Sequence, residues 1–248
     1  MRPSVTATFR FYAELNEFLE RSRRGHEFTL RCAQAATAKH MVEALGVPHT
    51  EVALLLVNGE PAPLDRLLSE GDRLSVYPVF GCFEAAPLQG NSPAPARFVA
   101  DAHLGGLARM LRMAGFDTLY DNGFGDADIE RLGGDQHRTV LTRDRELLKR
   151  RGVEHGCYVH ALAPAEQFRE IADRLRLAGL ARPFSLCLHC NEPLRDVPME
   201  DVLDRLPPSV RDTQREFRTC GKCGRVYWKG SHWKRMSALL TSALSGAC

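Results

Sequence analysis

The chain has no long apolar run, because no stretch of its 248 residues approaches the roughly 18 apolar residues of a membrane-spanning helix. No apolar core precedes a small-residue cleavage site near the start, so we expect no signal peptide and a cytoplasmic location. There is no Walker loop, no dinucleotide-type glycine pattern and no Ser-His-Asp order, which excludes the corresponding nucleotide-binding and hydrolase motifs. With 44% hydrophobic and 26% charged residues, collagen-like and fully disordered classes are excluded as well.

Charge is almost balanced overall but uneven along the chain. The 33 basic and 31 acidic residues give a net charge of +2. Residues 205–235 alone hold 9 basic and 2 acidic residues, a net charge of +7. A basic stretch of this size is typical of contact with a polyanion, although the same charges could form a solvated face.

The first 80 residues alternate in a pattern typical of a small mixed domain. Strands are expected over 5–12, 26–32, 51–60 with an Asn58-Gly59 turn, and 71–80, with a helix over 37–46 that Thr37 can cap. The text VNGEPAPLDRLLSEGDRLSVYPVFG resembles the second half of the ubiquitin-like β-grasp sulfur carriers. Those carriers end in Gly-Gly, whereas Gly81 here is followed by Cys82 and more chain, so we do not expect the carrier chemistry.

The clearest linker is AAPLQGNSPAPA, residues 85–96, which is uncharged and rich in proline. It separates the expected β-grasp domain, 1–84, from a second domain over 97–182. There, strands alternate with helices, a pattern that favours a parallel sheet with helices on both faces. Residues 183–248 follow as a third part.

Aspartates stand where the predicted strands of the second domain end. Asp101 and Asp144 each follow a strand, and Asp126 and Asp128 open a short helix between them, with Asp121 as a weaker fourth candidate. Carboxyl ends of parallel strands share one edge of a sheet, so these side chains could hold Mg²⁺ or Mn²⁺. The alternative is that each aspartate only caps the helix that follows it.

The text FVADAHLGGLARMLRMAGFDTLY, then D-x-D-I, then TVLTRDRELLKRRG, resembles the Mut-seven C-terminal RNase family of PIN-like nucleases, in which a fused ubiquitin-like module is also known. The resemblance covers about residues 97–237, including CGRVYWKGSHW. It implies metal-dependent hydrolysis of RNA with Asp101 and Asp144 as acids and Asp126, or alternatively Asp128, as the helix-start acid. Gly133-Gly134 departs from the family pattern and predicts a shortened helix.

Four of the eight cysteines form two Cys-x-x-Cys pairs, Cys187 with Cys190 and Cys220 with Cys223, separated by 29 residues. This spacing is typical of one tetrahedral zinc held by four thiolates. Because four protein ligands close the coordination sphere, we expect the zinc to be structural. Two redox motifs are the weaker alternative, because neither pair opens a helix after a strand.

Basic and aromatic residues supply candidate contacts to nucleic acid. Arg109 and Arg143 could bind phosphate or be ordinary surface charges, and Arg112 is expected to be a surface charge. Trp228 is expected in the core of the ribbon. The candidates near the end of the chain are Lys229, His232, Trp233, Lys234 and Arg235.

Together these features predict a small α+β ubiquitin-like (β-grasp) module, a PIN-like α/β domain with a parallel sheet and flanking helices, and a four-cysteine zinc ribbon. The expected function is metal-dependent hydrolysis of RNA, with one structural zinc and catalytic Mg²⁺ or Mn²⁺. The β-grasp module could bind a protein partner, and no membrane is involved. Two alternatives stay open: an RNA-binding protein without catalysis, and an adaptor related to ubiquitin-like or sulfur-carrier proteins.

Overall fold

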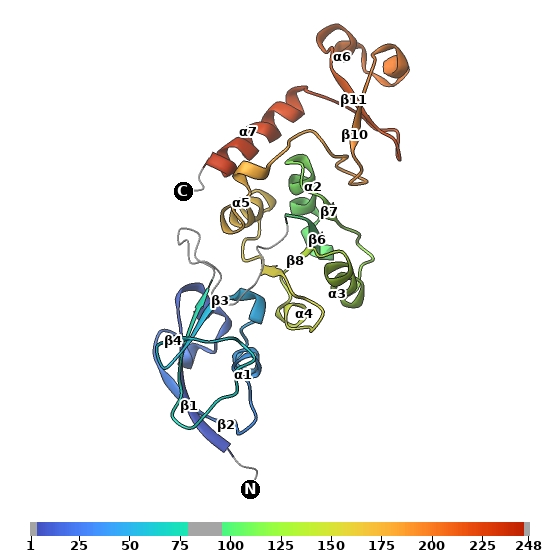
Figure 1. Cartoon of the computed structure of the whole chain (residues 1–248). Coiled ribbons are helices and arrows are strands. Elements are labelled where there is room, and N and C mark those ends of the chain that lie inside the picture. Colours follow the sequence, from blue (N-terminus) through green and yellow to red (C-terminus); the bar gives the residue numbers. More distant parts are fainter. Residues whose placement is uncertain (1–3, 79–95, 246–248) are drawn as a thin grey trace. The chain divides into compact units, whose positions relative to one another are not determined.

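A computed structural model describes residues 4–78 and 96–245 (Figure 1). The predicted linker at 85–96 therefore lies outside the described residues except for Ala96, as do Cys82 and Cys248. The chain forms two compact units, one of residues 1–95 and 130–158 and the other of residues 96–129 and 159–248. In the part that the structure describes, none of the helices has the length and apolarity needed to cross a membrane.

The first unit contains the predicted β-grasp fold. Its elements are β1 (Ser4–Phe11), β2 (Phe28–Ala33), α1 (Ala38–Ala44), β3 (Val52–Val57), β4 (Glu60–Pro61) and β5 (Arg73–Pro78). The sheet order is β2-β1-β5-β3-β4, with β1 parallel to β5 and the other neighbours antiparallel. Short 3-10 turns lie at Ala13–Phe18, Arg21–Arg23 and His49–Glu51.

Local sequence explains these elements. Thr37 caps α1 by accepting a hydrogen bond from the His40 amide, as a threonine before a helix is expected to do. Asn58 and Gly59 adopt positive φ angles of 56° and 87° in the β3–β4 turn, a conformation that asparagine and glycine tolerate best. Alternate residues of the strands, such as Phe9 and Phe11, are buried in one core.

The rest of the first unit comes from the predicted α/β domain. It holds β8 (Thr139–Thr142), α4 (Arg145–Leu148) and β9 (Gly156–Tyr158), with β8 parallel to β9. Helix α4 is only one turn long. Asp144 caps its start, and Lys149 is the residue that caps its end.

The second unit holds β6 (Phe98–Ala100), α2 (Gly105–Met113), β7 (Thr118–Leu119), α5 (Pro164–Arg174) and α7 (Ser231–Ser245), with short 3-10 turns at Ala102–Leu104 and Ala178–Leu180. Strands β6 and β7 pair in parallel, and α5 packs on both α2 and α7 (Figure 1). Leu104 at the end of the first turn and Leu107, Ala108 and Leu111 of α2 follow helical spacing, and all four are buried.

Helix α3 (Asp126–Asp135) includes Gly133 and Gly134, so the prediction that these glycines shorten the helix is wrong. A Cβ at Gly133 would lie 2.9 Å from Val140 Cγ2 of β8. Glycine is needed there because helix and strand approach closely, and that packing outweighs the low helix propensity of glycine.

The ribbon consists of β10 (Leu194–Val197), β11 (Phe217–Cys220) and β12 (Val226–Trp228) in one antiparallel sheet. Its insert forms a 3-10 turn at Glu200–Arg205 and helix α6 (Pro208–Thr213). Val202, Leu206 and Phe217 make a small core, and Trp228 packs against it, which confirms the expectation for this tryptophan. The basic and aromatic segment after β12, for which the sequence pattern predicted no helix or strand, continues into helix α7 from Ser231 onward.

Candidate metal centre and active site

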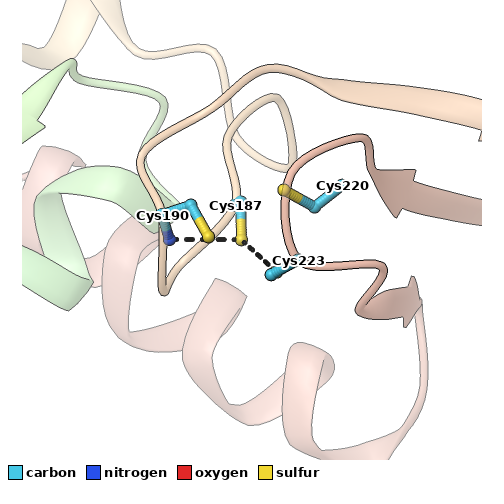
Figure 2. A group of neighbouring side chains, drawn as sticks. All are labelled: Cys187, Cys190, Cys220 and Cys223. Carbon is cyan, nitrogen blue, oxygen red and sulfur yellow. Dashed lines mark hydrogen bonds between the residues drawn. The ribbon is translucent and has the colours of Figure 1, made fainter.

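The four paired cysteines lie together at one end of the ribbon. Figure 2 shows their side chains on two facing loops, and the sulfur atoms all lie within 4.8 Å of one another. Cys187 Sγ and Cys223 Sγ are 3.7 Å apart, close to the edge of about 3.8 Å of a tetrahedron with Zn–S distances of about 2.3 Å. The cluster can therefore hold a metal such as zinc, and its soft thiolate donors suit that ion.

Both knuckles have the same backbone geometry. In the first, the Asn191 amide donates to the Cys187 carbonyl at 2.9 Å, and in the second the Gly224 amide donates to the Cys220 carbonyl at 2.9 Å. Asn191 and Gly224 occupy the same left-handed position, with φ angles of 65° and 68°. Asparagine and glycine are the residues that adopt this conformation most readily, so each loop turns tightly enough to aim two thiols at one point.

The cysteine thiols differ in acidity. Hydrogen bonding from the Arg225 backbone lowers the pKa of Cys223 to about 6, whereas burial raises the pKa of Cys190 to about 12. Burial also raises the pKa of Cys220. Cys223 therefore ionises before Cys190 and Cys220, and a bound divalent cation would displace the protons of those two thiols.

Two residues outside the Cys-x-x-Cys motifs complete this centre. The Tyr227 hydroxyl lies 3.1 Å from Cys187 Sγ, and burial raises the pKa of Tyr227, so the hydroxyl keeps its proton and can donate to the sulfur. Arg112 of α2 is 4% exposed and donates from Nη1 to the carbonyls of Leu188 and His189 at 3.1 and 2.9 Å. The expectation of a surface charge at Arg112 is wrong, because its guanidinium holds the first knuckle.

Asn191 adds a second link between this knuckle and the α/β elements. Its Oδ1 accepts from the Thr118 amide at 2.9 Å, and its Nδ2 donates to Asp117 Oδ1 at 2.5 Å. Sequence reasoning missed both Asn191 and Arg112, since their roles depend on residues more than 70 positions away. The only local signal was for Asn191: an asparagine directly after Cys190 can adopt the left-handed conformation that ends the knuckle.

Asp101 directly follows β6 and is partly buried. Its Oδ1 accepts from the Ala102 amide at 2.6 Å, so it caps the 3-10 turn Ala102–Leu104. Tyr120, which the sequence did not single out, donates from its hydroxyl to the Ala102 carbonyl at 2.9 Å. A Cβ at Gly105 would lie 2.5 Å from that hydroxyl oxygen, so the glycine allows Tyr120 to hold the turn beside Asp101.

Asp144 lies two residues after the end of β8 and is exposed. Its Oδ1 accepts from the Glu146 amide at 2.8 Å, and its own amide donates to Thr142 Oγ1 at 2.9 Å. Both strand-end aspartates therefore cap the turn that follows, as the alternative interpretation expected. A cap uses one carboxylate oxygen, and a carboxylate offers about four lone pairs, so capping and metal binding are compatible.

Asp126 and Asp128 lie in the first turn of α3. Asp126 is exposed at the first position of the helix, and Asp128 accepts from the Gly125 amide at 3.3 Å. Asp121 makes a separate turn by accepting from the Gly123 amide at 2.8 Å. Within the described residues, the four cysteines are the one group of three or more His, Cys, Asp or Glu side chains whose ligand atoms could share an ion. The metal site at the aspartates stays a prediction.

The predicted nucleic-acid contacts have mixed surroundings. Arg109 is exposed on α2, and Arg143 is partly buried between β8 and Asp144. Lys229 pairs with Glu216 at 2.7 Å and lies 6.0 Å from the ring centroid of Trp233. Two further predicted contacts, Lys234 and Arg235, are exposed on α7, and the side chain of His232 lies outside the described part.

Trp233 is partly buried and packs edge-on against Phe184, with ring centroids 6.1 Å apart. A groove of about 620 Å³ lies beside this pair, lined by Phe184, Arg215, Arg218 and Lys229 together with Asp196 and Glu216 among others. Its cationic and aromatic side chains are of the types that contact single strands, but two acidic groups share the groove with them.

Comparison with known proteins identifies both halves of the chain. The family model described as Mut7-C RNAse domain matches residues 96–240, and the one described as Mut7-C ubiquitin matches residues 4–84. No curated protein matches the chain.

Two solved structures resemble part of it. SAMP1 from Haloferax volcanii is 22% identical, covering 29% of this chain and 93% of its own, with a TM-score of 0.23. A second structure, H. volcanii small archaeal modifier protein 1, is 23% identical over 30% of this chain and 97% of its own, also with a TM-score of 0.23. Since the RNAse-domain model matches more than half of its length, the chain belongs to the Mut7-C RNAse domain family.

Proposed function

We propose that the protein is a divalent-metal-dependent ribonuclease that hydrolyses RNA phosphodiester bonds. The observation that carries this proposal is the match of an RNAse-domain family to residues 96–240, in which Asp101 and Asp144 lie within two residues of the ends of strands that pair in parallel. In this view the ubiquitin-like module spans 1–84, the nuclease domain 97–182 and the zinc ribbon 183–248, with 85–96 as the linker.

The aspartates suit a hard divalent cation because carboxylate oxygens are the ligands that Mg²⁺ and Mn²⁺ prefer. Asp101, Asp144 and either Asp126 or Asp128 would hold the ion. When bound, it would polarise the phosphodiester and lower the pKa of the attacking water. The caps at Ala102 and Glu146 fix the direction of two of these carboxylates before any ion binds. This preorganisation is what a catalytic metal site requires.

The cysteine cluster would hold one structural zinc. It supplies four thiolates and leaves no position open for water, so it serves folding rather than catalysis. The ribbon and α7 would then present Lys229, Trp233, Lys234 and Arg235 to RNA, with His232 on the same helix. Arg109 and Arg143 would contact phosphates nearer the aspartates. A protein partner of the ubiquitin-like module stays a prediction.

The test is cleavage of an end-labelled single-stranded RNA by protein purified without contaminating nuclease. We expect cleavage with Mn²⁺ or Mg²⁺, none after chelation, and recovery when the ion is restored. A crystal soaked in Mn²⁺ should show the ion among the aspartates. RNA binding without cleavage under every metal condition would support the non-catalytic alternative instead.

A further inference from the structure

The ubiquitin-like module and the segment 130–158 form one unit, and specific contacts join them. Tyr158 of β9 packs against the core of the module. Its ring meets Phe18 edge-on, with centroids 5.2 Å apart. A Cβ at Gly156 would lie 3.4 Å from the Thr50 side chain, so the backbone of β9 passes close to the module at this position.

Arg145 makes the most specific of these contacts. Its guanidinium donates to the Phe18 carbonyl at 3.2 Å and to the Glu17 carbonyl at 3.4 Å. It also lies 4.8 Å from the ring centroid of Phe18 and 5.7 Å from that of Tyr158. A planar guanidinium that stacks on rings and donates to two carbonyls is held in one orientation, which a lysine could not reproduce.

In addition, two side chains of the module form hydrogen bonds to the backbone of segment 130–158. Glu51 is fully buried, and its Oε1 accepts from the Tyr158 amide at 2.8 Å. His49 Nε2 lies 3.1 Å from the Val153 carbonyl, which can only accept, so the imidazole donates. A buried carboxylate needs a hydrogen-bond partner, and Glu51 has one in Tyr158, which lies 107 residues further along the chain.

Arg145 is the residue directly after Asp144. The contacts that hold Arg145 against the module can therefore affect the position of Asp144. In the Asp144 turn (residues 142–146), the Glu146 amide donates to the Asp144 carboxylate, and the Asp144 amide donates to Thr142 Oγ1. We propose that the ubiquitin-like module supports the Asp144 turn within the same chain, with Arg145 as the positioning residue that Phe18 holds. The module is then a working part of the nuclease. This inference rests on the proposed function only for its effect on cleavage.

The experiment compares full-length Arg145→Met, Phe18→Leu and the double variant with the natural chain. Hydrogen exchange of the Glu146 amide reports the Asp144 cap directly, and it should become roughly 5–30-fold faster in each single variant. The Mn²⁺ concentration for half-maximal RNA cleavage should rise, while KM for RNA stays unchanged. Because the two residues touch, the double variant should be little worse than the worse single variant.

The matched control is Arg73→Met. It removes an exposed arginine of the same module, which forms an ion pair with Glu27. It should leave the Glu146 exchange rate and the Mn²⁺ dependence unchanged. If Arg145→Met fails to fold, Phe18→Leu alone decides. If the Glu146 amide of Phe18→Leu exchanged its hydrogen at the same rate as in the natural chain, the inference would be overturned. Higher cleavage activity in either single variant would also overturn it. A natural chain that cleaves no RNA would refute the proposed function, while the exchange measurement would still decide this one.

Discussion

The cysteine cluster and the aspartates are both predicted metal sites, but they differ in how their ligands are positioned. Each cysteine pair comes from one tight loop, in which Asn191 or Gly224 completes the turn. Only two loops must therefore meet. The aspartates come singly, from the end of β6, the end of β8 and the start of α3, so several elements must pack correctly before they can act together.

The contrast shows what each site requires of the chain around it. The cysteine centre needs its loops held, which Arg112 and Asn191 do through backbone hydrogen bonds. The aspartates need their turns held, which Tyr120 does for the first and Arg145 for the second. The hydrogen bonds that hold the first knuckle and the Asp144 turn join residues more than 70 positions apart, although the cysteine ligands come in local pairs and the aspartates do not.

The largest effect should follow loss of a zinc ligand. Cys187→Ser should lose the single bound zinc and the fold of the ribbon, because structural zinc contributes about 10–16 kcal/mol of binding free energy in zinc-finger peptides. Elemental analysis and thermal unfolding measure the loss. Cys32→Ser, at a buried cysteine of the β-grasp core, should keep one zinc per chain. Natural protein without zinc would refute the proposed centre.

Next in size is the effect on cleavage of the strand-end carboxylates. Asp101→Asn and Asp144→Asn should each lower kcat by roughly 100-fold or more, the scale lost with one preorganised electrostatic group. Stability should barely change, since Asn can still cap Ala102 and Glu146 through its side-chain oxygen. RNA cleavage and thermal unfolding of the same preparations measure the two quantities.

The control for these variants is Asp135→Asn, at an exposed aspartate on the last residue of α3, which should cleave normally. Asp126→Asn and Asp128→Asn, made separately, should show which supplies the third acid. If the Asp101 and Asp144 variants cleaved at the natural rate, these residues would be caps and nothing more.

A smaller effect should follow loss of the arginine that holds the first cysteine knuckle. Arg112→Met should lower the free energy of unfolding by about 2–3 kcal/mol, because the buried guanidinium bonds that hold the first knuckle are lost. It should also speed the release of zinc to a chelator. Arg109→Met, at an exposed residue of the same helix, should change stability by less than about 0.5 kcal/mol. Equal stability of the two variants would contradict the role given to Arg112.

The smallest effect concerns binding of RNA. Replacing Lys229, Lys234 and Arg235 by Ala should flatten the slope of log affinity against log salt by up to about 0.7 for each lost phosphate contact. Lys229 should contribute least, since Glu216 already neutralises it at 2.7 Å. An unchanged slope would mean that these residues do not touch phosphate. Alanines at Arg21, Arg31 and Arg73 of the module provide the control and should leave the slope as it is.

Much of the fold could be predicted from the amino-acid sequence, because local signals carry it. Alternating apolar residues indicate the strands, Thr37 marks the start of α1, and Asn58-Gly59 marks the turn between β3 and β4. Helix α7 was missed because a basic and aromatic segment has no clear helical stripe, and its helix is held by packing on α5. The effect of Gly133-Gly134 was misjudged for the same kind of reason, since the close approach to Val140 is not a local property.

Ligand chemistry also followed from the sequence alone, since thiols at Cys-x-x-Cys spacing point together whatever surrounds them. Which residues hold each site, by contrast, depends on the folded arrangement of the chain. Arg112 reaches carbonyls 76 and 77 residues away, and Arg145 reaches a carbonyl 127 residues away. A buried guanidinium gains its partners only when distant segments fold against each other. Nothing in the residues beside an arginine distinguishes that fate from exposure to water.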